Sequence, residues 1–137
     1  MRHYTSIEQS KKLLELGLSP ETADMWYNID IVDKFGIDSY NDKPSFENYQ
    51  FSDIPCWTTD ALISIMPPYL FEWERGIDLI IYPSLNKKKG WNLAYMPNNI
   101  NAMQKDKFRQ ITHGDTPLEA AYTMMLWLLE NKYIKKK

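Results

Sequence analysis

The first part of the chain carries a clear helix pattern. Apolar residues recur at helical spacing from Ile7 to Leu18, with polar residues between them. Thr5 and Glu8 have the spacing of a capping box, in which each side chain bonds a free backbone amide at the start of a helix. Gly17 stands where a left-handed glycine commonly ends one. The pattern predicts a helix that is capped by Thr5 and ends at Gly17.

The pattern changes after this helix. Ser19 followed by Pro20 is typical of a second helix start, and we expect that helix to run to about Trp26. Residues 27–55 show no helical period, yet they are rich in aromatic side chains, which disordered linkers lack. We therefore expect an ordered loop, with a short strand at residues 29–32.

A third helix is short. Thr58 or Thr59 caps a helix that starts at Asp60. It is expected to end near Met66, because the Pro-Pro pair that follows disfavours its continuation.

The second half of the chain alternates apolar and polar residues as strands do. Trp91, Leu93 and Tyr95 line one face of the clearest strand. The last strand is the weakest, because a helical turn at residues 102–107 competes with it. The expected strands, in meander order, span residues 69–74, 77–82, 91–96 and 107–113.

The last helix begins with a second capping box, formed by Thr116 and Glu119, and has Pro117 at its first position. Its polar residues form one narrow stripe, which leaves an apolar arc of about 260°. Such a helix must be covered on more than one side.

Together these elements predict a single α+β domain over residues 1–137. Residues 1–66 form a region of helices and loops. Residues 67–137 form an antiparallel meander of three or four strands, with the helix at residues 118–129 packed across one face and the N-terminal helices alongside. The expected core residues are Trp91, Leu93, Tyr95, Leu118, Tyr122, Met125 and Leu129.

The last helix also predicts an interface. Trp127 lies about 180° around the helix from Leu118, beside Met124, so a sheet on the Leu118 side cannot cover it. Either the N-terminal helices cover this face, or Trp127 and Met124 anchor a homodimer or a partner protein.

Composition narrows the class of protein. Hydrophobic residues make up 44% of the 137 residues and aromatic residues 14%, which excludes a disordered or collagen-like chain. A single cysteine and two histidines exclude a disulfide scaffold and leave little for a zinc site. The longest apolar run, residues 120–129, is too short to span a membrane. We expect a cytoplasmic protein with no membrane segment and no cofactor.

Charge is distributed unevenly along the chain. Residues 1–83 hold 14 acidic and 6 basic residues (−8), whereas residues 84–137 hold 4 acidic and 10 basic residues (+6). Lys87, Lys88 and Lys89 lie close to Trp91, and basic residues beside aromatic ones are typical of nucleic-acid binding surfaces. The alternative is a hairpin loop that is rich in lysine because it is exposed to solvent.

Two places could carry a reactive group. His113 lies close to Asp115 in the sequence, an arrangement that fits a general base and its orienting carboxylate, although a strand exit and a helix cap explain the same residues. Cys56 would be a nucleophile only if a basic neighbour lowered its pKa. Its aromatic surroundings favour a small buried hydrophobic residue instead.

Three carboxylates could gather around a divalent cation. Glu72 and Glu74 share one face of a predicted strand, and Asp78 follows across the turn. The solvent face of an antiparallel sheet produces the same alternation without any function. The sequence contains no phosphate-binding glycine loop and no nucleophile elbow.

Two resemblances add to this interpretation. The segments SIEQSKKLLELGLSPETADMWY, IPCWTTDALISIMP and GDTPLEAAYTMMLWLLENKYI resemble a family of small proteins encoded in phage and integrated prophage genomes. That resemblance implies a cytoplasmic protein of a mobile element or of its bacterial host, and it carries no activity to transfer. KKGWNLAYMPN followed by THGDTPLEAA is similar to the HicB-like antitoxin pattern, in which a strand ends at proline and Gly-Asp-Thr opens a helix. This second resemblance covers about thirty residues and implies a meander with a helix.

The function expected from these observations is that of a non-enzymatic interaction protein of phage or prophage type. The first alternative is a nucleic-acid-associated accessory or antitoxin-like protein. The second is a small metal-dependent hydrolase or nuclease.

Overall fold

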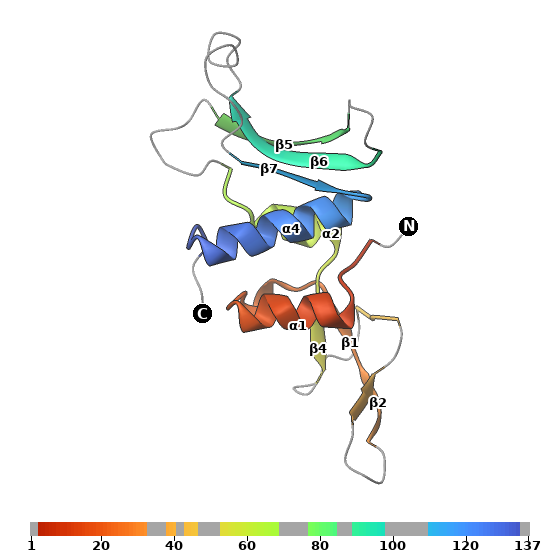
Figure 1. Cartoon of the computed structure of the whole chain (residues 1–137). Coiled ribbons are helices and arrows are strands. Elements are labelled where there is room, and N and C mark those ends of the chain that lie inside the picture. The colour runs from red at the N-terminus through yellow and green to blue at the C-terminus, as the bar shows by residue number, and fades with distance from the viewer. Residues whose placement is uncertain are drawn as a thin grey trace.

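The computed structural model shows an α+β protein (Figure 1). It describes residues 3–32, 38–40, 43–46, 53–68, 77–84, 89–97 and 110–134. The predicted strand at residues 69–74 lies outside these residues. No helix in the described ranges has the length and apolar character needed to cross a bilayer.

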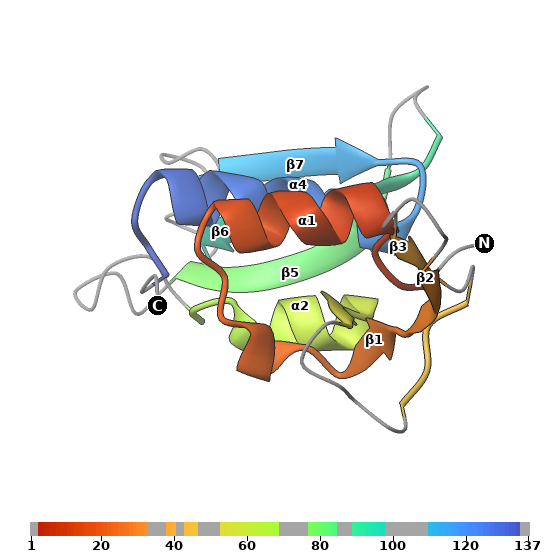
Figure 2. The same cartoon turned by 90° about the horizontal axis from the view of Figure 1, so that it is seen from below.

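A three-stranded sheet forms one layer of the fold. Its strands are β5 (Ile77–Pro83), β6 (Trp91–Pro97) and β7 (Gln110–Gly114), paired antiparallel in the order β5-β6-β7. This confirms the meander; the described part of its last strand is Gln110–Gly114, and residues 107–109 of the prediction lie outside the described residues. One face of the sheet is covered by α4 (Pro117–Glu130), and α2 (Thr59–Ile65) packs against α4 (Figures 1 and 2).

The N-terminal part of the chain lies on the far side of α4 from the sheet (Figure 1). α1 (Ile7–Glu15) contacts both α4 and the strand β4 (Ile54–Cys56). β4 pairs antiparallel with β1 (Met25–Tyr27). A second small pair, β2 (Ile29–Val32) with β3 (Asp38–Tyr40), extends away from this layer and confirms the strand predicted at residues 29–32.

The start of α1 differs from the prediction by one residue. Ser6 is the N-cap, and its capping box is completed by Gln9: Ser6 Oγ accepts from the Gln9 amide at 3.1 Å, and Gln9 Oε1 accepts from the Ser6 amide at 2.9 Å. The predicted cap, Thr5, is fully buried, and its hydroxyl accepts a hydrogen bond from the Trp57 amide at 3.1 Å. The Thr5 hydroxyl, which the local pattern predicts as the helix cap, is therefore used in a tertiary hydrogen bond instead.

The end of α1 is as predicted. Gly17 has φ of 100°, a left-handed conformation that costs glycine little. The Leu18 amide donates to the Leu13 carbonyl and the Gly17 amide to the Leu14 carbonyl, which is the Schellman arrangement.

The second predicted helix is wrong beyond its first turn. Pro20–Thr22 forms a single 3-10 turn, η1, and the chain then becomes extended. Met25–Tyr27 pairs with Ile54–Cys56, and the side chains of Met25 and Tyr27 are buried. Pairing with a segment about thirty residues away overrides the helical start signal.

The remaining helix starts are largely as expected. Thr58 caps α2 and its hydroxyl accepts from the Ala61 amide at 3.1 Å. Thr116 caps α4 by accepting from the Glu119 amide at 3.2 Å. The Glu119 side chain was expected to complete the capping box by accepting from the Thr116 amide. Instead, its carboxylate accepts from Gln9 Nε2 at 3.3 and 3.4 Å. Gln9 thereby joins the starts of α1 and α4.

The main core lies around α4. Leu93, Tyr95, Leu118, Met125 and Leu129 are buried, as predicted. Trp91 and Tyr122 are only half-buried, which corrects the predicted core. Trp91 stands at the end of the sheet, paired with Pro83 and Gly114, and Tyr122 lies next to the exposed Thr123 on α4.

Candidate functional site

The three-stranded sheet has one face against α4 and one face turned away from it. Thr112 faces α4, since its hydroxyl donates to the Ala120 carbonyl at 2.9 Å, and Leu93 pairs with it across the strands. Strand alternation therefore turns Asn92 and Ala94 to the opposite face. We call this opposite face the open face, and its described side chains are Ile80, Tyr82, Asn92, Ala94, Ile111 and His113.

The open face consists of an apolar row and a polar row. The apolar row runs across the three strands through the half-buried Ile80, the fully buried Ala94 and the exposed Ile111, so its accessible surface lies at its two ends. Ile111 is 42% exposed, one of the most exposed large hydrophobic side chains in the described residues. Isolated exposed hydrophobic residues are common, but this one continues a row that crosses the whole described sheet.

The polar row is held by hydrogen bonds. His113 Nδ1 lies 2.8 Å from Asn92 Oδ1, and the Asn92 side chain also bonds Tyr82 on the neighbouring strand. Burial raises the pKa of Tyr82 above its usual value, while the hydrogen bond from Asn92 partly offsets this effect. The three polar groups are thus fixed in place before any ligand binds.

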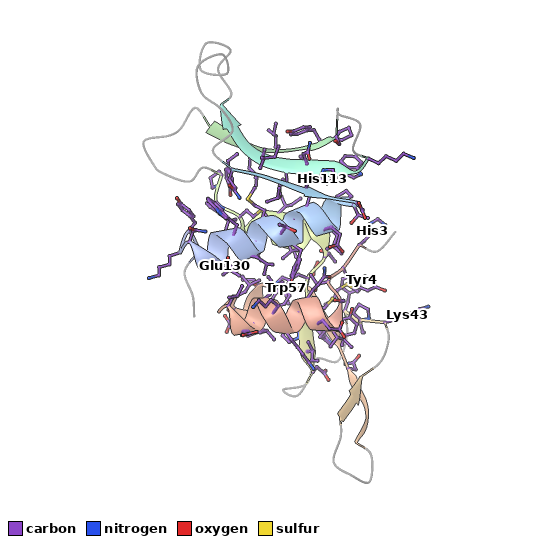
Figure 3. All side chains as sticks on the ribbon, viewed as in Figure 1. His3, Tyr4, Lys43, Trp57, His113 and Glu130 are labelled. Carbon is purple, nitrogen blue, oxygen red and sulfur yellow. The ribbon has the colours of Figure 1, made fainter. Side chains whose placement is uncertain are left out.

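This row also sets the proton positions on the imidazole. An amide oxygen can only accept, so the proton between Asn92 and His113 belongs to His113 Nδ1. In the neutral ring, His113 Nε2 then carries a lone pair and accepts hydrogen bonds. A Cβ on Gly90 would lie 3.1 Å from this nitrogen, so glycine at position 90 leaves space beside it. Figure 3 labels His113 at this end of the sheet.

The structure shows no hydrogen bond or ion pair between the described residues His113 and Asp115, which the sequence offered as a base and its orienting carboxylate. His113 is bonded to Asn92, and Asp115 is exposed in the turn that leads to α4. Gly114 separates the two residues and packs against the start of that helix. The arrangement explains both residues without a catalytic dyad.

The carboxylate cluster falls mostly outside the described residues. Glu72 and Glu74 are not among them, and for Asp78 only the backbone is described, paired with Met96 in β5 and β6. Among the described residues, no group of three or more histidine, cysteine, aspartate or glutamate side chains is placed to hold a metal ion.

Of the three lysines predicted to bind nucleic acid, Lys87, Lys88 and Lys89, only Lys89 is among the described residues. Lys89 is exposed at the end of the loop that precedes β6, next to Gly90 and to the half-buried Trp91. Lys87 and Lys88 lie outside the described residues. The exposed ammonium of Lys89 is therefore carried at the same end of the sheet as His113.

Cys56 is buried in the N-terminal layer. Its thiol is bonded to Thr5, with Sγ 3.3 Å from the Thr5 carbonyl oxygen, and it is 0% exposed. Burial, the largest cause, raises the pKa of the Cys56 thiol to about 11. The interpretation of Cys56 as a small buried hydrophobic residue fits these surroundings.

We expect Cys56 to resist alkylation in the folded protein. With a pKa of about 11 in place of 9.0, the thiolate fraction at pH 8 falls about 100-fold, and burial blocks access as well. Iodoacetamide labelling followed by intact-mass measurement should show unmodified native protein and complete labelling in 6 M guanidinium chloride. Rapid labelling of the native protein would contradict the buried position.

Met124 and Trp127, the two residues expected at an interface on α4, differ in their exposure to solvent. Met124 is 0% exposed within the chain itself, so its side chain has no surface to offer a partner, which corrects that prediction. α1 and α2, which pack on α4, provide the cover that the sequence left open. Trp127 is half-buried and stacks on Tyr133, with ring centroids 5.2 Å apart.

Sequence reasoning missed the polar row. No local pattern connects Asn92 to Tyr82 or His113. Strand alternation alone places Asn92 on the face opposite Leu93. The register that brings the three together was not available from local patterns.

Comparisons with protein-family models, with curated proteins and with solved structures find no match for this chain. The functional argument therefore rests on the chemistry of the described surface.

Proposed function

We propose that the protein acts by binding a partner protein through the open face of its sheet, without catalysing a reaction. The observation that carries this proposal is the 42% exposed Ile111 at the end of the apolar row, directly beside hydrogen-bonded polar groups on the same face. An exposed apolar side chain with fixed polar groups at its side is a combination found in protein interfaces. Their fixed positions reduce the entropy lost on binding.

The same proposal includes the biological setting that the sequence resemblance implies, a small cytoplasmic protein of phage or prophage type. In that setting the bound partner is a protein of the mobile element or of its host. The open face is the part of this chain that we assign to the contact.

The proposal predicts position-dependent cross-linking. We place a photo-cross-linking phenylalanine analogue at Ile111, or at Lys11 as the control, and irradiate cells that produce either variant. Lys11 is exposed on α1, in the layer farthest from the sheet. We expect a discrete protein adduct from position 111 at a yield at least tenfold above that from position 11. Equal adducts from both positions, or none from position 111, would contradict the proposal.

A nucleic-acid partner is the second candidate, favoured by the exposed Lys89 at the same end of the sheet as Tyr82 and His113. Its test is a mobility-shift titration with DNA and RNA at several salt concentrations. Retardation that weakens with salt and is lost when Lys87, Lys88 and Lys89 are replaced by glutamine would favour this candidate. Its absence at low salt would exclude it.

A further inference from the structure

The hydrogen bonds of the polar row on the open face run in one direction. His113 Nδ1–H donates to Asn92 Oδ1 at 2.8 Å, and the Asn92 amide nitrogen donates to the phenol oxygen of Tyr82. The bond to Tyr82 lowers the pKa of the phenol, as a donated hydrogen bond does, whereas an amide oxygen that accepted from the phenol would raise it. Both polar atoms of Asn92 are therefore used inside the row.

His113 Nε2 stands at the end of this row with a lone pair. Among the described residues this nitrogen has no hydrogen-bond partner. Gly90 lies beside it without a side chain, and a Cβ at position 90 would lie 3.1 Å from Nε2. A partner atom that bonds this nitrogen must supply the proton, because the neutral ring can only accept there.

We propose that the partner protein places a hydrogen-bond donor, an N–H or O–H group, on His113 Nε2, and that protonation of this nitrogen releases the partner. The inference rests on the proposed function of the open face and names the chemistry and the regulation of that contact. A proton on Nε2 removes the lone pair, so two donors would meet. Binding is therefore strongest where the ring is neutral and is lost as the pH falls.

Protonation changes the open face and leaves the polar row intact. Nδ1 carries a proton in the neutral ring and in the charged ring, so the bond to Asn92 Oδ1 persists when the second proton binds. Histidine is the side chain whose ordinary charge change falls between pH 5 and 8. The pH range in which the partner is released is thus one that cells and their compartments reach.

The charged groups around His113 do not favour one sign of partner. Lys89 and Asp115 are both exposed, and they carry opposite charges on the two segments that meet at Gly90. Glu119, at the start of α4, bonds Gln9. The described titratable or charged groups on the elements around His113 are therefore Tyr82, Lys89, Asp115 and Glu119. An uncharged donor suits this setting as well as a charged one does.

The test measures how the position-111 cross-link depends on pH. The photo-cross-linking analogue at Ile111 is irradiated in clarified lysates of the same cells at pH 7.5 and at pH 5.5. His113→Gln removes the titrating group and keeps an acceptor at the end of the side chain. His3→Gln is the matched control, because His3 is the second histidine of the chain and is exposed before α1 (Figure 3).

We expect the adduct yield to fall at least fivefold from pH 7.5 to pH 5.5, both in the protein with His113 and in His3→Gln. In His113→Gln it should change less than twofold. A yield that stays constant, a yield that rises on acidification as an acidic partner group would cause, or an equal fall in His113→Gln would overturn the inference and leave the proposed function standing. No adduct at either pH would overturn both.

A second measurement needs no partner. Nitrogen-15 NMR of the full chain with labelled histidine, at pH 8, reports which ring nitrogen of His113 carries the proton. We expect the proton on Nδ1 and the lone pair on Nε2. A proton on Nε2 at this pH would overturn the inference whatever the cross-linking shows.

Discussion

Gly114→Ala is expected to lower the free energy of unfolding by about 3 kcal/mol, because an added Cβ has no space at this position. It would lie 2.5 Å from the Ala120 nitrogen, 2.5 Å from Glu119 Cβ and 2.7 Å from the Glu119 carbonyl carbon. Two of these atoms belong to the helix backbone, so a side-chain rotation cannot relieve the contact. Either α4 or β7 must move.

Such a movement would disturb the contact that fixes α4 on the sheet. Thr112, two residues before Gly114, donates to the Ala120 carbonyl, and both residues are buried. Urea unfolding followed by tryptophan fluorescence measures the effect. The control is Asp115→Ala, an exposed neighbour whose replacement should change stability by about 0.5 kcal/mol or less. A Gly114→Ala protein as stable as this control would show that the close packing of strand and helix is not as described.

The second large effect is expected at Thr5, whose hydroxyl organises the N-terminal layer. It accepts from the Trp57 amide at 3.1 Å and shares a hydrogen bond of 2.8 Å with the Ser10 hydroxyl. Thr5 and Ser10 are both 0% exposed. Thr5→Val keeps the shape but leaves the Trp57 amide, the Ser10 hydroxyl and the Cys56 thiol, which lies 3.7 Å away, without this partner, at a cost of about 3 kcal/mol in unfolding free energy.

Two further variants separate the hydroxyl from the rest of the side chain. Thr5→Ser keeps the hydroxyl and loses one methyl group, so it should cost about 1 kcal/mol. Thr59→Val makes the same exchange at a half-buried position at the start of α2, with an expected change of about 0.5 kcal/mol or less. Chemical denaturation of the set checks the order. Equal stabilities of Thr5→Val and Thr5→Ser would contradict a role for the hydroxyl.

The elements that the sequence predicted well are those with local signals. α2 and α4 begin at a threonine cap and carry their own apolar patterns, and β5 and β6 are short runs of β-branched and aromatic residues. The register of the meander and the polar row of Tyr82, Asn92 and His113 depend on how distant strands align. Alignment of that kind leaves no local signature, so only the membership of each face could be predicted.

The N-terminal part shows the opposite situation, in which local signals were present but misleading. Two capping boxes overlap at Thr5–Glu8 and Ser6–Gln9, and local geometry cannot choose between them. The choice is made by Trp57, whose amide binds the Thr5 hydroxyl. Likewise, Met25–Tyr27 forms a strand because β4 lies beside it, not because of its own propensity.

The hydrogen bonds between Gln9 and Glu119 have a consequence for the order in which the chain assembles. They join residues 110 positions apart, so forming them requires closure of nearly the whole chain. The pairings of β5, β6, β7 and α4 connect neighbouring elements and require much smaller loops, which carry a lower entropic cost. We therefore expect α1 to dock after the sheet and α4 have come together. For the same reason, amide exchange in α1 should reveal local opening before exchange in α4 does.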